Sequence, residues 1–179
     1  MCAHSGVNDD SRRKIFNLTT WGNKTTGGLF DLDRIKLAEI YQKAESVFEW
    51  GLGESTFIAA CVGVPRYAGI DSDAVWIQSA REKSPDLFRF QLGDIGPTGS
   101  WGRPEKNRLP KSYLNYQFAP LLSENNAFDV YMVDGRMRPA CALVGFLHAS
   151  SCGRTDEERS PLVLVHDYFD EGKSSACGR

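Results

Sequence analysis

Acidic residues follow five apolar segments of the chain, each at or near the point where the segment ends. These acids are Glu49, Asp71, Asp94, Asp134 and Asp167. The first lies in VFEWGLGEST, residues 47–56, where Gly51 and Gly53 allow a tight turn between a strand and a helix. Free N–H groups at such a helix start can point at a ligand. Carboxylates beside this turn can bind an ammonium group or a ribose diol and can offset a sulfonium charge.

The elements that must position these acids alternate between helices and strands. The sequence predicts helices at 31–46, 54–62, 74–83, 113–123 and 138–150, and strands at 46–50, 66–73, 87–92, 128–135 and 161–168. Strands that are almost continuously apolar and separated by helices indicate a parallel sheet with right-handed crossovers. We therefore expect an α/β, Rossmann-like fold, with a mostly parallel sheet of about five strands and helices on both faces.

Composition limits the classes of protein and partner. A chain of 179 residues, 41% of them hydrophobic, can bury the core of one domain, which we place at 15–170 between disordered tails at 1–14 and 171–179. The formal charge of −2 and the lack of a long apolar run predict no nucleic-acid or membrane partner. The N-terminus has no apolar segment typical of a secretory signal. Five cysteines without paired metal spacing predict free thiols and a soluble, cytoplasmic protein.

The five acids should share one rim, because the carboxyl ends of parallel strands lie at the same edge of a sheet. In such sheets the ligand binds where the strand order reverses. A dinucleotide fits this rim poorly, since Glu54 would repel its pyrophosphate and Thr56 replaces the third glycine of GxGxxG. S-adenosylmethionine fits better, because it carries an ammonium group, a ribose diol and a sulfonium. A nicotinamide-dependent oxidoreductase is the weaker alternative.

Several motifs together resemble the class I S-adenosylmethionine-dependent methyltransferases, in a methyltransferase-like family with the pattern E-W-G-x-G-x-S-T and V-D-G-R. The motifs are VFEWGLGEST, YAGIDSD, GDIGPTGSWGRP, FDVYMVDGRMRPACALVGFLHA and VLVHDY. The resemblance covers roughly residues 31–170. It implies that the methionine end of the cofactor lies at Glu49, Gly51 and Gly53, with Ser55 where many members have a third glycine. It also implies that Asp71 holds the ribose hydroxyls and that Asp94 contacts the adenine amino group.

Each of these residues also has a purely structural interpretation. Glu49 could be a solvated strand end, and Asp71 could cap the next helix, although Asp73 is better placed to do so. Gly93 and Asp94 form an ordinary turn pair. The sequence leaves these alternatives open.

Residues after the fourth and fifth strands are candidates for the transfer step. Methyl transfer mainly needs two aligned reactants, so one base, or none, suffices. His166 is the candidate base, with Asp134 and Asp167 beside it, although it could be a hydrogen-bonded structural residue. The two acids resemble the pair that binds a divalent ion in catechol-type O-methyltransferases, but two ligands are incomplete and we predict no metal. Arg136 and Trp101 are candidates to bind the acceptor.

Two classes of function remain open. The chain is either a methyltransferase acting on a small molecule or a sugar hydroxyl, or a non-catalytic, truncated methyltransferase-like binding domain. A complete class I sheet has seven strands, as the resemblance implies, and the polar residues after 161–168 lack a strand pattern. We therefore predict that the C-terminal hairpin is missing, and that the chain is either a truncated product of low stability or pairs through the strand-five edge with a second copy or another polypeptide. Alternatively, segment 15–30 covers that edge.

Overall fold

The computed structural model describes residues 28–99, 102–105, 109–154 and 160–167. Within these ranges five strands form one sheet in the order β3-β2-β1-β4-β5, and every neighbouring pair is parallel. The strands are β1 (Ser46–Trp50), β2 (Arg66–Asp71), β3 (Arg89–Leu92), β4 (Val130–Val133) and β5 (Leu162–Val165). The predicted Rossmann-like α/β sheet is confirmed.

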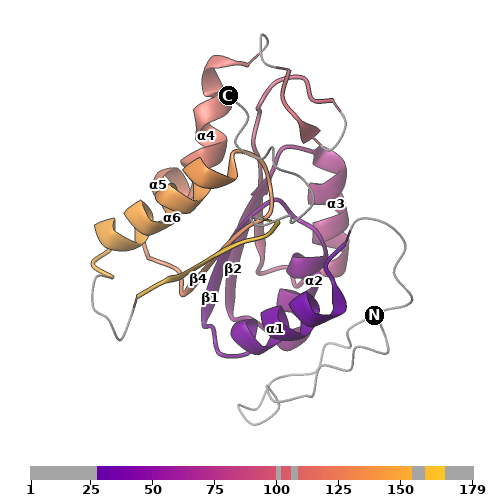
Figure 1. The fold of residues 1–179 in the computed structure, drawn as a ribbon, viewed down its shortest axis with the longest axis vertical. Coiled ribbons are helices and arrows are strands. Elements are labelled where there is room, and N and C mark those ends of the chain that lie inside the picture. Colours follow the sequence, from indigo (N-terminus) through magenta and orange to yellow (C-terminus); the bar gives the residue numbers. More distant parts are fainter. Residues whose placement is uncertain (1–27, 100–101, 106–108, 155–159, 168–179) are drawn as a thin grey trace.

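Helices cover both faces of the sheet (Figure 1). Helices α1 (Asp31–Tyr41), α2 (Glu54–Val62) and α3 (Ala74–Lys83) pack on one face, and the short η4 (Lys111–Tyr113), α4 (Leu114–Gln117) and α5 (Ala119–Ser123) precede α6 (Arg138–Ser151). Residues of α4, α5 and α6 belong to the core on the opposite face. The strand order reverses between β1 and β4, so the loops after these two strands flank the switch point of the sheet.

The central strand β1 shows why its sequence is apolar throughout. Val47 packs into the core under α1–α3, whereas Phe48 and Trp50 pack into the core under α4–α6. Side chains of a strand alternate between the two faces, and here both faces are covered. All five residues of β1 are therefore buried, including the acid Glu49.

Capping hydrogen bonds and a proline determine where several of the helices begin and end. Asp73 caps α3 by accepting a 2.8 Å bond from Val75 N, as expected. Asp31 does not cap α1; it is the first helical residue, and the cap position is held by Phe30. The predicted single helix at 113–123 is broken, because Pro120 has no N–H for the carbonyl of Tyr116. That carbonyl instead accepts a 2.9 Å bond from Nε1 of Trp50.

Strand β5 is paired only with β4 in the part of the chain that the structure describes. The predicted missing hairpin, the edge pairing and both tails concern residues outside that part, and they stay predictions. Of segment 15–30, the structure describes only residues 28–30, where Leu29 is buried in the α1–α3 core and its N–H donates to Glu54 at 2.9 Å. The alternative that this segment covers the β5 edge also stays a prediction.

No helix in the described ranges is both long and apolar enough to cross a membrane. Cys141 and Cys152 are free thiols. Cys61 is disulfide-bonded, so the expectation of free thiols throughout is wrong at this position. The odd number of cysteines and the lack of metal spacing could not reveal which thiols the fold brings together.

Candidate functional site at the switch point

The glycine turn after β1 and the loop after β4 touch each other at the switch point. Gly51 has φ +86°, which favours glycine, and a Cβ built on it would lie 2.5 Å from Cα of Gly135. A Cβ on Gly135 would in turn collide with the hydroxyl of Tyr116, which comes from α4. Two glycines therefore let the two loops meet with no side chain between them. Sequence reasoning found Gly51 but missed Gly135, although it lies within the V-D-G-R motif.

Three N–H groups of the glycine turn are already hydrogen-bonded within the protein. Gly51 N donates to Ile70 O at 2.9 Å. Leu52 N donates to Asp71 Oδ2 at 2.7 Å, and Gly53 N donates to the Thr56 hydroxyl at 3.1 Å. These three N–H groups of the turn are therefore not free for a ligand, and the expectation for the N–H groups at the start of α2, from Glu54 onward, stays a prediction.

The open side of the turn lies at Gly53. Its backbone is extended, and a Cβ built on it would meet no atom within 4 Å. Gly53 is therefore not required by packing, in contrast to Gly51. Space for a ligand group lies directly above it.

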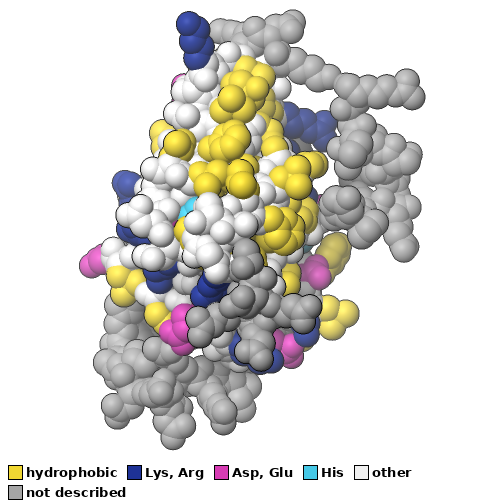
Figure 2. Space-filling model, turned by 90° about the vertical axis from the view of Figure 1, so that its left-hand side faces the viewer, with side chains coloured by type: hydrophobic (Ala, Val, Ile, Leu, Met, Phe, Trp, Pro, Cys, Tyr) yellow, Lys and Arg dark blue, Asp and Glu magenta, His cyan; other side chains and the backbone are white. Residues whose placement is uncertain are grey.

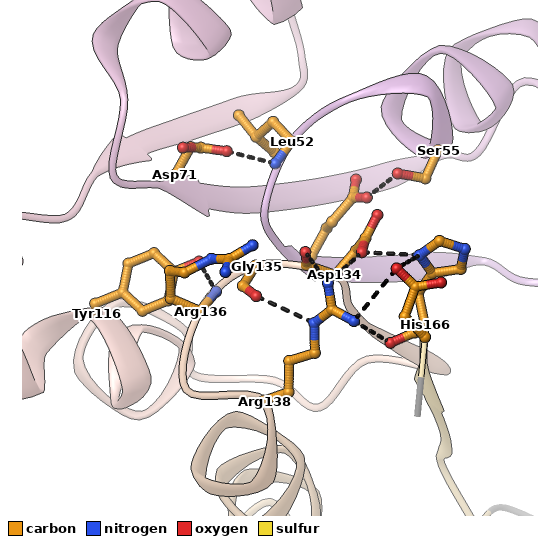
Figure 3. A network of polar contacts seen from close by, with 11 residues as sticks. Leu52, Ser55, Asp71, Tyr116, Asp134, Gly135, Arg136, Arg138 and His166 are labelled. Atoms are coloured by element: carbon orange, nitrogen blue, oxygen red, sulfur yellow. Dashed lines mark hydrogen bonds and ion pairs between the residues drawn. The ribbon is translucent and has the colours of Figure 1, made fainter. Parts of the chain in front are cut away.

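Asp71 joins the end of β2 to the glycine turn (Figure 3). Its second oxygen, Oδ1, accepts from Asp73 N at 2.9 Å, and burial raises the pKa of the carboxyl while these backbone bonds oppose the rise. A carboxylate has about four lone-pair sites. The carboxylate of Asp71 therefore keeps lone-pair capacity beyond its bonds to the backbone.

Glu49 lies beneath the turn, on the α2 side of the sheet, and is fully buried. Its carboxyl accepts from the hydroxyls of Ser55 and Tyr67, and from Thr56 at 2.9 Å. Burial raises the pKa of Glu49 to about 8, although the hydroxyls of Ser55 and Thr56 oppose the rise. Glu49 is not a solvated strand end. Ser55, at the third-glycine position, donates a hydrogen bond from its hydroxyl to this buried acid.

We expect Glu49→Gln to flatten the dependence of folding stability on pH. Folding raises the pKa of the Glu49 carboxyl from 4.5 to about 8. Between these two pH values the unfolded chain therefore binds fewer protons than the native protein. The wild type thus loses stability as the pH rises through this window. Urea unfolding at several pH values measures the slope.

Asp71 and His166 also have raised pKa values, so the readout is the difference between wild type and variant. Glu39→Gln, on the exposed face of α1, is the matched control and should leave the slope unchanged. An unaltered slope in Glu49→Gln would contradict the buried neutral acid.

Asp94 lies exposed after β3, at the same rim. Its carboxylate accepts from Gly96 N at 3.0 Å and from the Ser112 hydroxyl at 3.4 Å. The bond from Gly96 N closes a local turn, which is the structural interpretation that the sequence left open, whereas Ser112 lies 18 residues further along the chain. The exposed carboxylate can still accept a bond from a ligand.

Asp134, His166 and Asp167 come together at the adjacent ends of β4 and β5, as expected. His166 Nδ1 lies 3.0 Å from Asp134 Oδ1 and 3.5 Å from Asp167 Oδ2. The hydrogen bond with Asp134 raises the pKa of His166, although burial opposes the rise. The imidazole is thus oriented by a carboxylate, as a general base requires.

Arg138, the first residue of α6, holds this group in place (Figure 3). Its guanidinium donates to the carboxylate of Asp134 at 3.0 Å, to the carbonyl of Gly135 at 3.2 Å and to the carbonyl of His166. It therefore ties the β4 loop to the end of β5. Sequence reasoning missed this role, and the available signal was the i, i+4 spacing from Asp134.

The same three side chains offer ligand atoms that lie within 4.8 Å of one another. Arg138 already places a fixed positive charge 3.0 Å from Asp134 Oδ1 and 3.8 Å from Asp167 Oδ2. A divalent cation would be repelled by this charge, so the geometry favours a hydrogen-bonded base over a metal centre.

Arg136 lies at the switch point, where its N–H donates to the Tyr116 hydroxyl at 3.3 Å. Its guanidinium has no hydrogen bond or ion pair within the described ranges, and burial lowers its pKa. A half-buried, unpaired guanidinium suits an anionic group. The other acceptor candidate, Trp101, lies outside the described residues.

Glu54 has a partner that the sequence did not predict. Its carboxylate lies 2.5 Å from Nε of Arg34 in α1. This ion pair offsets the charge that was expected to repel a pyrophosphate. The argument against a dinucleotide therefore rests on Thr56, whose hydroxyl already satisfies Gly53 N.

The chain was compared with protein families, curated proteins and solved structures, and a solved structure shares its fold. No family model matches the chain, and no curated protein matches it either. Among solved structures, a methyltransferase-like protein from Silicibacter pomeroyi DSS-3 is similar, with 30% sequence identity and a TM-score of 0.58. The match covers 67% of this chain and 66% of that chain, slightly less than two thirds of its length. Together with the parallel sheet, this similarity establishes that the chain has a methyltransferase-like fold.

Proposed function

We propose that this chain binds S-adenosylmethionine along the rim of the sheet and transfers its methyl group to a small-molecule acceptor. The proposal rests mainly on one observation: a carboxylate lies on one side of the switch point and a histidine–aspartate pair lies on the other. Asp71 lies at the end of β2 beside the open face of Gly53, and the His166–Asp134 pair lies at the ends of β5 and β4. The methyltransferase-like neighbour supports the same assignment.

The residues present fit the cofactor. Asp71 has two carboxylate oxygens with capacity for a diol, and the surface above Gly53 has room for the ligand chain. The buried hydroxyl of Tyr41 has no hydrogen-bond partner in the described ranges, and burial raises its pKa. When bound, S-adenosylmethionine would supply an electrophilic methyl group. We assign Glu49 the role of supporting the turn, because its hydroxyl partners separate it from the rim.

The side chains of His166 and Arg136 indicate which class of acceptor the site would bind. His166, oriented by Asp134, would remove a proton from an acceptor hydroxyl, since neutral imidazole accepts one at near-neutral pH. Arg136 would hold an anionic part of the acceptor, because its half-buried guanidinium has no hydrogen bond or ion pair among the described residues. The substrate class is therefore a small molecule that carries both a hydroxyl and an acidic group. The sugar hydroxyls considered above fit when the sugar is acidic.

The binding titrations described below distinguish the proposed methyltransferase from two other functions. A non-catalytic binding domain would bind the cofactor without turnover. A nicotinamide-dependent enzyme would bind NAD or NADP, which the bonded N–H of Gly53 disfavours.

We expect Gly53→Val to weaken binding of S-adenosylhomocysteine by at least about tenfold, or ~1.4 kcal/mol, without changing the melting temperature. The added side chain enters open space in the free protein, so only a ligand above the turn would meet it. Asp71→Ala should weaken binding by at least as much, because it removes charge-assisted bonds. Calorimetry measures both affinities.

Gln78→Val on the exposed side of α3 is the matched control and should bind like the wild type. NAD and NADP in parallel titrations test the alternative class of ligand. Wild-type affinity in both Gly53→Val and Asp71→Ala would refute the assignment of the rim. An inactive protein that binds normally would instead support the non-catalytic function.

A further inference from the structure

Helices α4, α5 and α6 present an apolar outer face, which we call the α4–α6 face (Figure 2). Its exposed large side chains form two rows, one along α4 and α5 and the other along α6. The first row consists of Leu114, Phe118 and Leu122, and the second of Leu143, Phe146 and Leu147. Leu122 is 65% exposed and Leu143 is 70% exposed. Exposed apolar patches of this extent on a folded domain mark interaction sites.

The rows are spaced as helix ridges. Leu114, Phe118 and Leu122 follow an i, i+4, i+8 pattern, and Leu143 and Leu147 are four residues apart on α6. Both α4 and α5 contact α6, so the two rows lie on neighbouring helices. Ridges of one helix pack into grooves of another at this spacing. The inner sides of these helices are already filled by the core, as Val144 and Ala149 show.

The α4–α6 face also lacks charge. No Asp, Glu, Lys or Arg occurs in 112–123 or 139–153, and the histidine of α6, His148, is buried and bonded to Tyr131. A chain with 25% charged residues would normally place several on two solvent-facing helical segments. Depletion of charge is the signature of an interface core, and it is strongest in homodimers.

We propose that the α4–α6 face is a two-fold interface between two copies of this chain. A second copy is the favoured occupant for two reasons. The face offers no charge with which to select a partner of opposite sign, and two uncharged copies can meet without like-charge repulsion. It also carries two rows on neighbouring helices, so that the α6 row of one copy can pack against the α4–α5 row of the other and the reverse, as an isologous contact requires.

The size of the face is consistent with a stable dimer. A standard interface buries about 800 Å² on each partner and involves roughly 20–30 residues a side. Nine residues of 111–123 and nine of 138–151 are at least partly exposed, and these 18 residues come close to the lower end of that range. The inference does not rest on the proposed methyl transfer. It also differs from pairing through the β5 edge, which uses backbone groups at a different part of the fold.

Sedimentation velocity of the full chain tests this interface. We expect the wild type to sediment at twice its chain mass of 19.9 kDa at micromolar concentration. Leu143→Glu combined with Leu147→Glu should give a monomer, because it would place four carboxylates at the interface core. Val75→Glu, at an equally exposed residue of α3, is the matched control and should remain dimeric.

A monomeric wild type would overturn the proposal, and this result does not depend on the variants folding. A dimer that persists in the double variant would also overturn it and would point to the β5 edge. Circular dichroism of the variants confirms that the substitutions, both at exposed positions, leave the helices intact.

Discussion

Replacing Gly51 by alanine is expected to destabilise the fold by about 2–5 kcal/mol. Two costs add at this position. The backbone has φ +86°, which an L side chain adopts at a cost of about 1–2 kcal/mol, and the new Cβ would lie 2.5 Å from the backbone of Gly135. Backbone atoms cannot rotate away as a flexible side chain can, so the β1 and β4 loops must separate. Urea unfolding measures the loss.

Gly53→Ala is the matched control for this change. It is two residues away in the same turn, but its backbone is extended and its Cβ would meet nothing within 4 Å. It should leave the free energy of unfolding within about 0.5 kcal/mol of the wild type. Equal stability of Gly51→Ala and Gly53→Ala would contradict the packed switch point.

The second large effect is expected from His166→Ala, which should lower methyl transfer by about a hundredfold, or ~2.7 kcal/mol, with cofactor affinity nearly unchanged. The reason is that His166 is the one imidazole at the strand ends in the described ranges, and Asp134 orients it at 3.0 Å. Single-turnover rates with acidic hydroxyl compounds, together with calorimetry, separate catalysis from binding.

The pH profile distinguishes a base from a structural histidine. Because Asp134 raises the pKa of His166, the rate should rise with pH through a midpoint above the ordinary value of 6.5. Asp134→Asn should move that midpoint to lower pH. A chelator should have no effect, since Arg138 already places a positive charge beside both acids. Activity abolished by chelator and restored by magnesium would assign the group to a metal instead, and full turnover in His166→Ala without a chelator effect would remove both roles.

The local pattern of the sequence was sufficient to predict the helices and strands. It was also sufficient to predict that the acids lie at one edge of the sheet. Strand β1 and helix α2 could be located to the residue, because a buried strand followed by glycines and an apolar helix has few other local solutions. Asp73 could be assigned as a cap for the same reason, since its partner is only two residues away. The strand ends then followed from the parallel topology.

Contacts between residues distant in the chain were decided only by the tertiary structure. Neither the packing of Gly51 against Gly135 nor the bond from Leu52 N to Asp71 has a local signal, because the partners lie at the ends of different strands and far apart in the chain. Whether Glu49 faces the rim or the interior depends on which side of the sheet α2 covers. The charge of Glu54 is likewise offset by Arg34, twenty residues earlier. Sequence pattern sets what each segment prefers, whereas packing selects which of its polar groups remain available for a ligand.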